Sequence, residues 1–228
     1  MELDMNKSLK GTTTIGIVCK DGIVLAADKR SSAGYRIADK SALKIHKIAD
    51  NMAVCMAGLV SDAQLIIKLA RSELMLKKIR SDAPEVTVKE GANLIANILY
   101  SNIRRPSMIP GIVGFILAGK DSRGFSLYDL GMDGSVTLFD DYVSDGSGSD
   151  LALGVLEAMY KKNIPIIEGV NLAVKAISAA ISRDMPTGNG IDVMTITDKG
   201  VSEITTRTIE TKILVWIFFN FWKCKVKF

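Results

Sequence analysis

The sequence is poor in the residues from which disulfide frameworks and many metal sites are built. It has only three cysteines and one histidine, His46, among 228 residues. Because Cys19, Cys55 and Cys224 are widely spaced, they form neither a disulfide framework nor a CxxC metal motif. We expect no metal and no organic cofactor. With five prolines and 48% hydrophobic residues, the composition also excludes disordered and collagen-like chains.

Excess positive charge is confined to the C-terminal end. The formal net charge is +4, and four lysines lie in residues 211–228, where there is no acidic residue. Positive and negative charges are therefore balanced over the rest of the chain, and we expect no nucleic-acid-binding face. The apolar run from Ile213 to Trp222 is shorter than the roughly 20 residues that span a bilayer. We expect no membrane attachment and give the tail no function. Four interpretations of the tail stay open. It is a terminal element docked on a partner, a poorly ordered end, the product of a reading-frame change or, less favoured, an anchor at a membrane surface.

Hydrophobic periodicity predicts eight strands and four helices. The expected strands cover 13–19, 23–27, 52–59, 112–119, 125–130, 136–139, 191–196 and 201–206, and the helices cover 62–79, 87–102, 150–161 and 166–183. Ser61 and Asp62 are expected to cap the first helix. Strands and helices come in separate blocks, which favours an α+β domain. Since the apolar runs 52–59 and 112–119 need cover on both faces, we expect two packed sheets between two helix layers.

Two features suggest chemistry only weakly. The Gly146–Ser149 turn precedes a helix and could hold an anion, but it lacks the spacing of a phosphate-binding loop. A tight turn with Ser149 or Asp150 as the helix cap is the favoured interpretation. His46 could be a general base, but no GxSxG nucleophile motif accompanies it. We therefore do not expect catalysis through histidine.

The stretch Gly11–Thr14 is more informative. If the chain were cut after Gly11, Thr12 would carry a hydroxyl and a free α-amine. An α-amine has a reference pKa of about 8, so it can accept a proton near neutral pH. One residue would then supply both nucleophile and base. Asp28 ends a predicted strand, and Lys44 lies between apolar residues. Spacing alone does not tell whether either is a surface residue or part of a site.

Several sequence blocks resemble the β subunits of archaeal 20S proteasomes. They keep the order and approximate spacing of that family over residues 8–206, and no one of them is specific alone. The matching blocks are Gly11–Ile17, Ile23–Arg30, Ala57–Gln64, Ser147–Ser149 with Gly154–Glu157, Ala179–Asp184 and Gly190–Asp192.

The resemblance implies an N-terminal nucleophile hydrolase with a four-layer αββα fold. Residues 1–11 would be a propeptide removed by self-cleavage, 12–210 the catalytic domain and 211–228 an atypical tail. In such a subunit Thr12 is the nucleophile, Lys44 lowers the pKa of its hydroxyl and Asp28 orients Lys44.

The remaining family site residues also have counterparts in this sequence. Ser147 and Asp184 would complete the site near the free amine, and the Gly58 backbone N–H would stabilise the oxyanion. Thr187 stands where the family usually has serine. The specificity pocket would be lined by Ser31 and Ser32 and would have Met56 at its base, which favours cleavage after hydrophobic residues.

The implied activity is that of a cytoplasmic threonine endopeptidase degrading unfolded polypeptides inside a chamber. Partners implied by the family are proteasome α subunits, other β subunits in a four-ring stack of seven-membered rings, and an ATP-dependent unfoldase. One alternative is a non-catalytic structural β subunit of the same particle. Another is the related bacterial ATP-dependent threonine peptidase, which fits the Ser147–Gly154 block less well.

Overall fold

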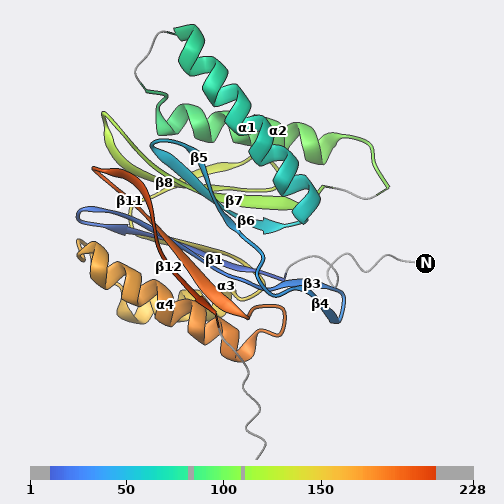
Figure 1. Cartoon of the computed structure of the whole chain (residues 1–228), viewed down its shortest axis with the longest axis vertical. Helices are drawn as coiled ribbons and strands as arrows, with labels where there is room; N and C mark the ends of the chain where they lie inside the picture. The colour runs from blue at the N-terminus through green and yellow to red at the C-terminus, as the bar shows by residue number, and fades with distance from the viewer. Residues whose placement is uncertain (1–10, 82–84, 109–110, 209–228) are drawn as a thin grey trace, which may run out of the picture.

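The chain forms four layers, two of helices outside and two of sheet inside (Figure 1). The computed structural model describes residues 11–81, 85–108 and 111–208. Helices α1 (Val60–Ser81) and α2 (Val88–Arg104) cover one sheet, and α3 (Ser149–Met159) and α4 (Ile166–Arg183) cover the other. This confirms the expected α+β sandwich.

Each sheet has five strands in antiparallel pairs. The first has the order β10-β1-β2-β11-β12, and its strands are β1 (Thr13–Cys19), β2 (Gly22–Asp28), β10 (Tyr142–Gly146), β11 (Gly190–Thr197) and β12 (Gly200–Thr208). The second has the order β5-β6-β7-β8-β9, and its strands are β5 (Ile45–Ala49), β6 (Met52–Gly58), β7 (Val113–Asp121), β8 (Gly124–Leu130) and β9 (Val136–Phe139). A separate hairpin joins β3 (Ser31–Ala33) to β4 (Arg36–Asp39).

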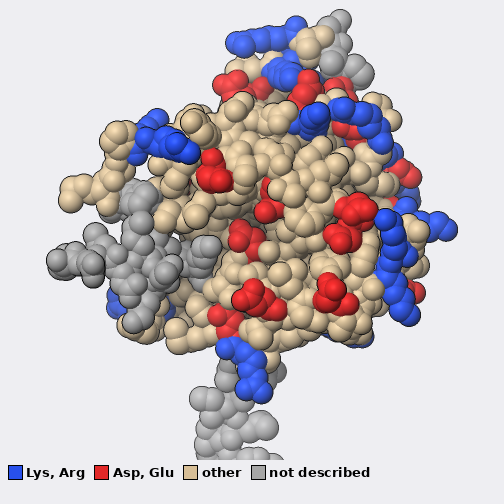
Figure 2. Space-filling model, turned by 180° about the vertical axis from the view of Figure 1, so that it is seen from behind, with Lys and Arg blue, Asp and Glu red and all other residues tan. Residues whose placement is uncertain are grey.

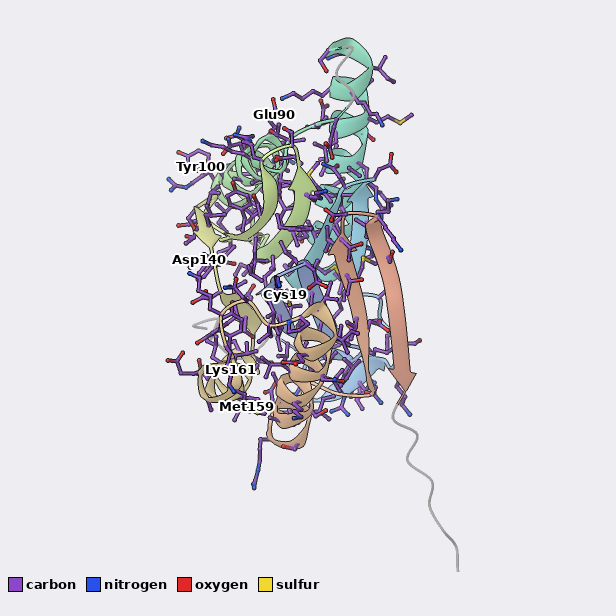
Figure 3. All side chains as sticks on the ribbon, turned by 90° about the vertical axis from the view of Figure 1, so that its left-hand side faces the viewer. Cys19, Glu90, Tyr100, Asp140, Met159 and Lys161 are labelled. Atoms are coloured by element: carbon purple, nitrogen blue, oxygen red, sulfur yellow. The ribbon has the colours of Figure 1, made fainter. Side chains whose placement is uncertain are left out.

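Apolar side chains fill the spaces between the layers (Figure 3). One cluster lies between α1–α2 and the second sheet, another between α3–α4 and the first sheet, and a third between the sheets. Side chains along β1 point alternately to the two faces of its sheet, so the strand contacts a helix layer on one face and the other sheet on the opposite face. Ile15 and Ile17 face the helices. Gly16 faces the other sheet, where an added Cβ would lie 2.6 Å from Leu127 Cδ1. Burial of these faces holds β1 at the centre of the molecule.

Most predicted elements are confirmed, with corrections at their ends. The first helix begins at Val60, so Ser61 and Asp62 lie inside its first turn and do not cap it. The N-cap of α3 is Gly148, without a side-chain capping bond, so the predicted caps Ser149 and Asp150 are wrong. Strands β3, β4, β5 and β10 were not predicted. All four are short, and β4 is exposed along its whole length, so hydrophobic patterning is weak there.

Residues 1–10 of the expected propeptide and the tail 211–228 lie outside the described residues. Within the described ranges, no helix is both long enough and apolar enough to cross a membrane. The same ranges place no three His, Cys, Asp or Glu side chains together as a metal site. The face turned away in Figure 1 has acidic side chains over its central area, with Lys and Arg mainly toward its margins (Figure 2).

Candidate active site

Thr12 lies directly before β1, which pairs with β2 on one side and β10 on the other. Thr12 is 6% exposed, and its Oγ1 donates a 2.7 Å hydrogen bond to the carbonyl oxygen of Gly11. The hydroxyl therefore already lies against the peptide bond that precedes it. β1, which begins at the next residue, is paired on both sides, so Thr12 is attached directly to the centre of the sheet.

Asp28, at the end of β2, is fully buried and has four hydrogen-bond donors around its carboxylate. Oδ1 accepts from the Thr13 N–H at 2.9 Å and from Lys44 Nζ at 2.7 Å. Oδ2 accepts from the N–H groups of Arg30 and Gly188, both at 2.9 Å. The carboxylate thus joins the residue after Thr12, the lysine and a distant loop. Saturation with donors makes a buried negative charge tolerable.

Lys44 lies immediately before β5 and is 3% exposed. Its Nζ also donates to the Gly11 carbonyl oxygen at 3.1 Å, so the same oxygen receives bonds from the lysine and from Thr12. Burial lowers the pKa of Lys44, against the opposing effect of Asp28. A lysine with a lowered pKa can exchange a proton, and as a cation it polarises the carbonyl it touches.

A second polar cluster surrounds the carboxylate of Asp184, the residue that follows α4. Asp184 Oδ2 accepts from Ser147 Oγ at 2.6 Å and from Thr187 Oγ1 at 2.5 Å. Ser147 Oγ also lies 3.4 Å from the Thr12 carbonyl oxygen, and Thr187 Oγ1 lies 2.7 Å from Thr13 Oγ1. This cluster therefore contacts the backbone of Thr12 and the side chain of Thr13, next to the nitrogen that cleavage after Gly11 would release as an α-amine.

Gly58 ends β6 just before α1 and has φ +125°, a conformation suited to glycine. An added Cβ would lie 2.3 Å from the Ile112 carbonyl oxygen, so a side chain does not fit. The residue lines the same cavity as Thr12. A backbone at this strand-to-helix junction can approach a bound peptide closely.

A cavity of about 810 Å³ opens beside Thr12 and Lys44. The residues expected in the specificity pocket, Ser31, Ser32 and Met56, all line it. Its other walls combine apolar with polar residues: Ala42, Leu43, Leu59, Val60, Met185, Pro186, Gly34, Tyr35, Asp39, His46, Ser61 and Gln64. The cavity can therefore hold an apolar side chain next to the hydroxyl.

The fold places the predicted catalytic side chains near Thr12 in two clusters, around Asp28 and around Asp184, and the predicted oxyanion and pocket residues in the cavity wall. Sequence reasoning missed Thr13, whose N–H and hydroxyl reach both clusters. It also missed Arg30, whose guanidinium donates to Asn189 Oδ1 at 2.7 Å and to the Met185 carbonyl oxygen at 2.6 Å. The only sequence signal for these two residues is that each is next to a candidate residue, Thr13 after Thr12 and Arg30 before Ser31.

His46, which sequence reasoning set aside, lines the cavity. Burial and the nearby Arg71 lower its pKa. Its Nε2 has no hydrogen-bond partner within the described part of the chain, and none of the Thr12 contacts described above involves it. The arrangement around Thr12 therefore uses lysine, carboxylate and hydroxyl groups.

Comparison with known proteins finds relatives of this chain over most of its length. A family model described as "Proteasome subunit" matches residues 8–196. "Proteasome subunit beta" of Ferroglobus placidus is 44% identical over 205 residues, which are 90% of this chain and 95% of that protein. "Proteasome subunit beta" of Archaeoglobus profundus is 44% identical over 209 residues, 92% of this chain and 94% of that protein. "Proteasome subunit beta 1" of Thermococcus onnurineus is 43% identical over 206 residues, 90% and 98% of the two chains.

Proposed function

This chain belongs to the proteasome subunit family, and from that premise we propose that it is a catalytic β subunit of a 20S core particle. Its relatives named "Proteasome subunit beta" support the β assignment. In this proposal it is a threonine endopeptidase that cuts unfolded polypeptides after hydrophobic residues. Its partners are α subunits and further β subunits in a cytoplasmic stack of four seven-membered rings, fed by an ATP-dependent unfoldase.

The observation that carries the proposal is the contact of Thr12 Oγ1 with the Gly11 carbonyl, at 2.7 Å, with Lys44 on the same oxygen. In self-cleavage Oγ1 attacks the carbonyl carbon of Gly11, and Lys44 stabilises the charge on the oxygen. The C–N bond to Thr12 then breaks, and the nitrogen takes up the hydroxyl proton. Water hydrolyses the resulting ester, which releases residues 1–11 and frees the hydroxyl and the α-amine of Thr12.

Peptide cleavage repeats the attack on a substrate carbonyl. The freed α-amine accepts the Thr12 hydroxyl proton, and Lys44, oriented by Asp28, assists its transfer. The amine returns the proton to the leaving nitrogen, and water then hydrolyses the acyl ester. Ser147 and Asp184 hold the amine, and the Gly58 N–H stabilises the oxyanion. The dense hydrogen bonding around Thr12 favours this role over that of a non-catalytic β subunit.

The test is the intact mass of the chain in the assembled particle. Wild type is expected to lose residues 1–11. Thr12→Ala is expected to keep them and to lose peptidase activity, because no attacking oxygen is present. Thr12→Ser keeps the hydroxyl and serves as the matched control, with self-cleavage retained. Residues 1–11 retained in wild type, or undiminished peptide hydrolysis by Thr12→Ala, would contradict the proposal.

A further inference from the structure

The side chain of Thr13 belongs to neither of the roles assigned above, yet it is fully buried inside the site. Its N–H donates to Asp28 Oδ1, and its hydroxyl lies 2.7 Å from Thr187 Oγ1. It therefore hydrogen-bonds to both clusters, to the one around Asp28 and to the one around Asp184. The backbone bond serves one cluster, and the side chain serves the other.

The direction of the hydroxyl bonds follows from counting protons. An ionised carboxylate only accepts, so Thr187, 2.5 Å from Asp184 Oδ2, donates its one proton there. Between the two threonine hydroxyls, Thr13 must then be the donor. The result is a directed chain from Thr13 to Thr187 to Asp184, and Ser147 donates to the same carboxylate oxygen, Oδ2.

Packing leaves the Thr13 hydroxyl little freedom to point elsewhere. Gly148 faces it, and a Cβ at that position would lie 2.2 Å from Thr13 Oγ1, 2.9 Å from Ala180 Cβ and 3.2 Å from Asp184 Oδ2. The absence of a side chain at Gly148 therefore makes the room that this hydroxyl occupies. A buried hydroxyl in a filled space keeps one orientation and one partner.

We propose that Thr13 is a positioning residue, whose hydroxyl fixes the Thr187 hydroxyl toward Asp184 and so holds Asp184 and Ser147 at the α-amine that cleavage frees. The inference rests on the proposed function and adds a residue to it. A hydroxyl that accepts a hydrogen bond is a stronger donor itself. Without the Thr13 donor, Thr187 neutralises the Asp184 charge less, and more negative charge faces the amine.

Thr13→Val removes the hydroxyl and nearly keeps the shape. We expect kcat for a fluorogenic peptide to fall about tenfold, with KM within about twofold, because the loss is in proton handling and not in the cavity. The acid limb of the profile of kcat/KM against pH, which reports the free amine, should move to higher pH, since added negative charge favours the protonated amine. Self-cleavage should continue, because the contacts of Thr12, Lys44 and Gly11 do not involve this hydroxyl.

Thr14→Val is the matched control. Thr14 is the next residue of β1 and is 1% exposed, but its hydroxyl donates to the Asp145 carbonyl oxygen, away from Asp184. This variant should keep the wild-type pH profile, and Thr13→Ser should restore both rate and profile. A general loss of folding would lower kcat/KM at every pH and would leave the acid limb of the pH profile at the same pH. Where Thr13→Val does not assemble, the smaller Thr13→Ala replaces it with the same expectations.

The outcomes separate the two proposals. Wild type that cleaves itself, together with a Thr13→Val variant of unchanged kcat and pH profile, would overturn the assignment of Thr13 alone. So would equal effects of Thr13→Val and Thr14→Val, or failure of Thr13→Ser to restore the rate. Wild type that keeps residues 1–11 and hydrolyses no peptide would overturn the proposed function, and the role of Thr13 with it.

Discussion

Carboxylates in this molecule differ in how well their charge is stabilised. The fully buried Asp28 accepts four hydrogen bonds, including one from Lys44, whereas the pKa of the half-buried Asp129 in β8 is lowered by one hydrogen bond, from the backbone of Leu130. Burial raises the pKa of Asp129 from 3.8 to about 6, with a smaller contribution from the charge of Asp145. The same residue type is therefore surrounded by hydrogen-bond donors in one place and disfavoured as a charge in another.

The raised pKa of Asp129 predicts a pH-dependent loss of stability. Between pH about 4 and 6 the folded state binds more protons at this residue than the unfolded state, so stability falls as pH rises through that window. Because Asp129 is only half-buried and water screens its charge, the penalty above pH 6 is on the order of 1 kcal/mol. We expect Asp129→Asn to raise the free energy of unfolding at pH 7 and to change it little at pH 4.

Urea unfolding of the isolated subunit at a series of pH values measures this effect. The difference between wild type and Asp129→Asn is the relevant quantity, because other carboxylates titrate equally in both. Curves that stay parallel from pH 4 to 7 would show that the Asp129 charge carries no penalty in the fold.

At the scale of elements, α2 has the clearest local signal. Thr87 accepts a hydrogen bond from the Glu90 N–H, and Glu90 Oε2 accepts from the Thr87 N–H, which together form a capping box. The side-chain hydrogen bond from Lys77, followed by the bonds from Thr87, lowers the pKa of Glu90 to about 2. The helix start predicted at residue 87 therefore has a local cause.

Thr87→Ala should lower the free energy of unfolding by about 1 kcal/mol, because one helix N–H loses its acceptor and Glu90 loses its hydroxyl partner. Thermal or urea unfolding measures this difference in the free energy of unfolding. Ser101→Ala on the same helix is the control: its exposed hydroxyl donates to the Asn97 carbonyl oxygen one turn earlier, and its removal should change stability by less than about 0.5 kcal/mol. Equal losses in the two variants would argue against the capping box.

At the scale of the whole molecule, the cavity beside Thr12 is built by segments far apart in the sequence. The β3–β4 hairpin, β6, the start of α1 and the loop at Met185 and Pro186 all contribute to it. Met56 is 6% exposed and belongs to the core cluster under α1, so this wall is part of the packed interior. Cavity shape therefore depends on how the layers pack.

The apolar walls predict the preference of the peptidase. Fluorogenic peptides with leucine or phenylalanine before the cleaved bond should be cut faster than peptides with arginine or glutamate there, because a charge entering these walls loses its water. The measurement is kcat/KM for each peptide, with the Thr12→Ala particle as the background. Fastest cleavage after arginine would contradict the interpretation of the cavity.

The sequence by itself determined the four long helices, most strands and their separate blocks, because hydrophobic patterns of period 3.6 and 2 are local properties. Motif order also singled out Thr12, Asp28, Lys44, Ser147 and Asp184. Only the tertiary structure decided that Asp28 and Lys44 are buried and paired, and that Thr13 links them to Asp184. The reason is physical: burial and hydrogen-bond partners come from residues up to 174 positions apart, which meet only when the sheets pack.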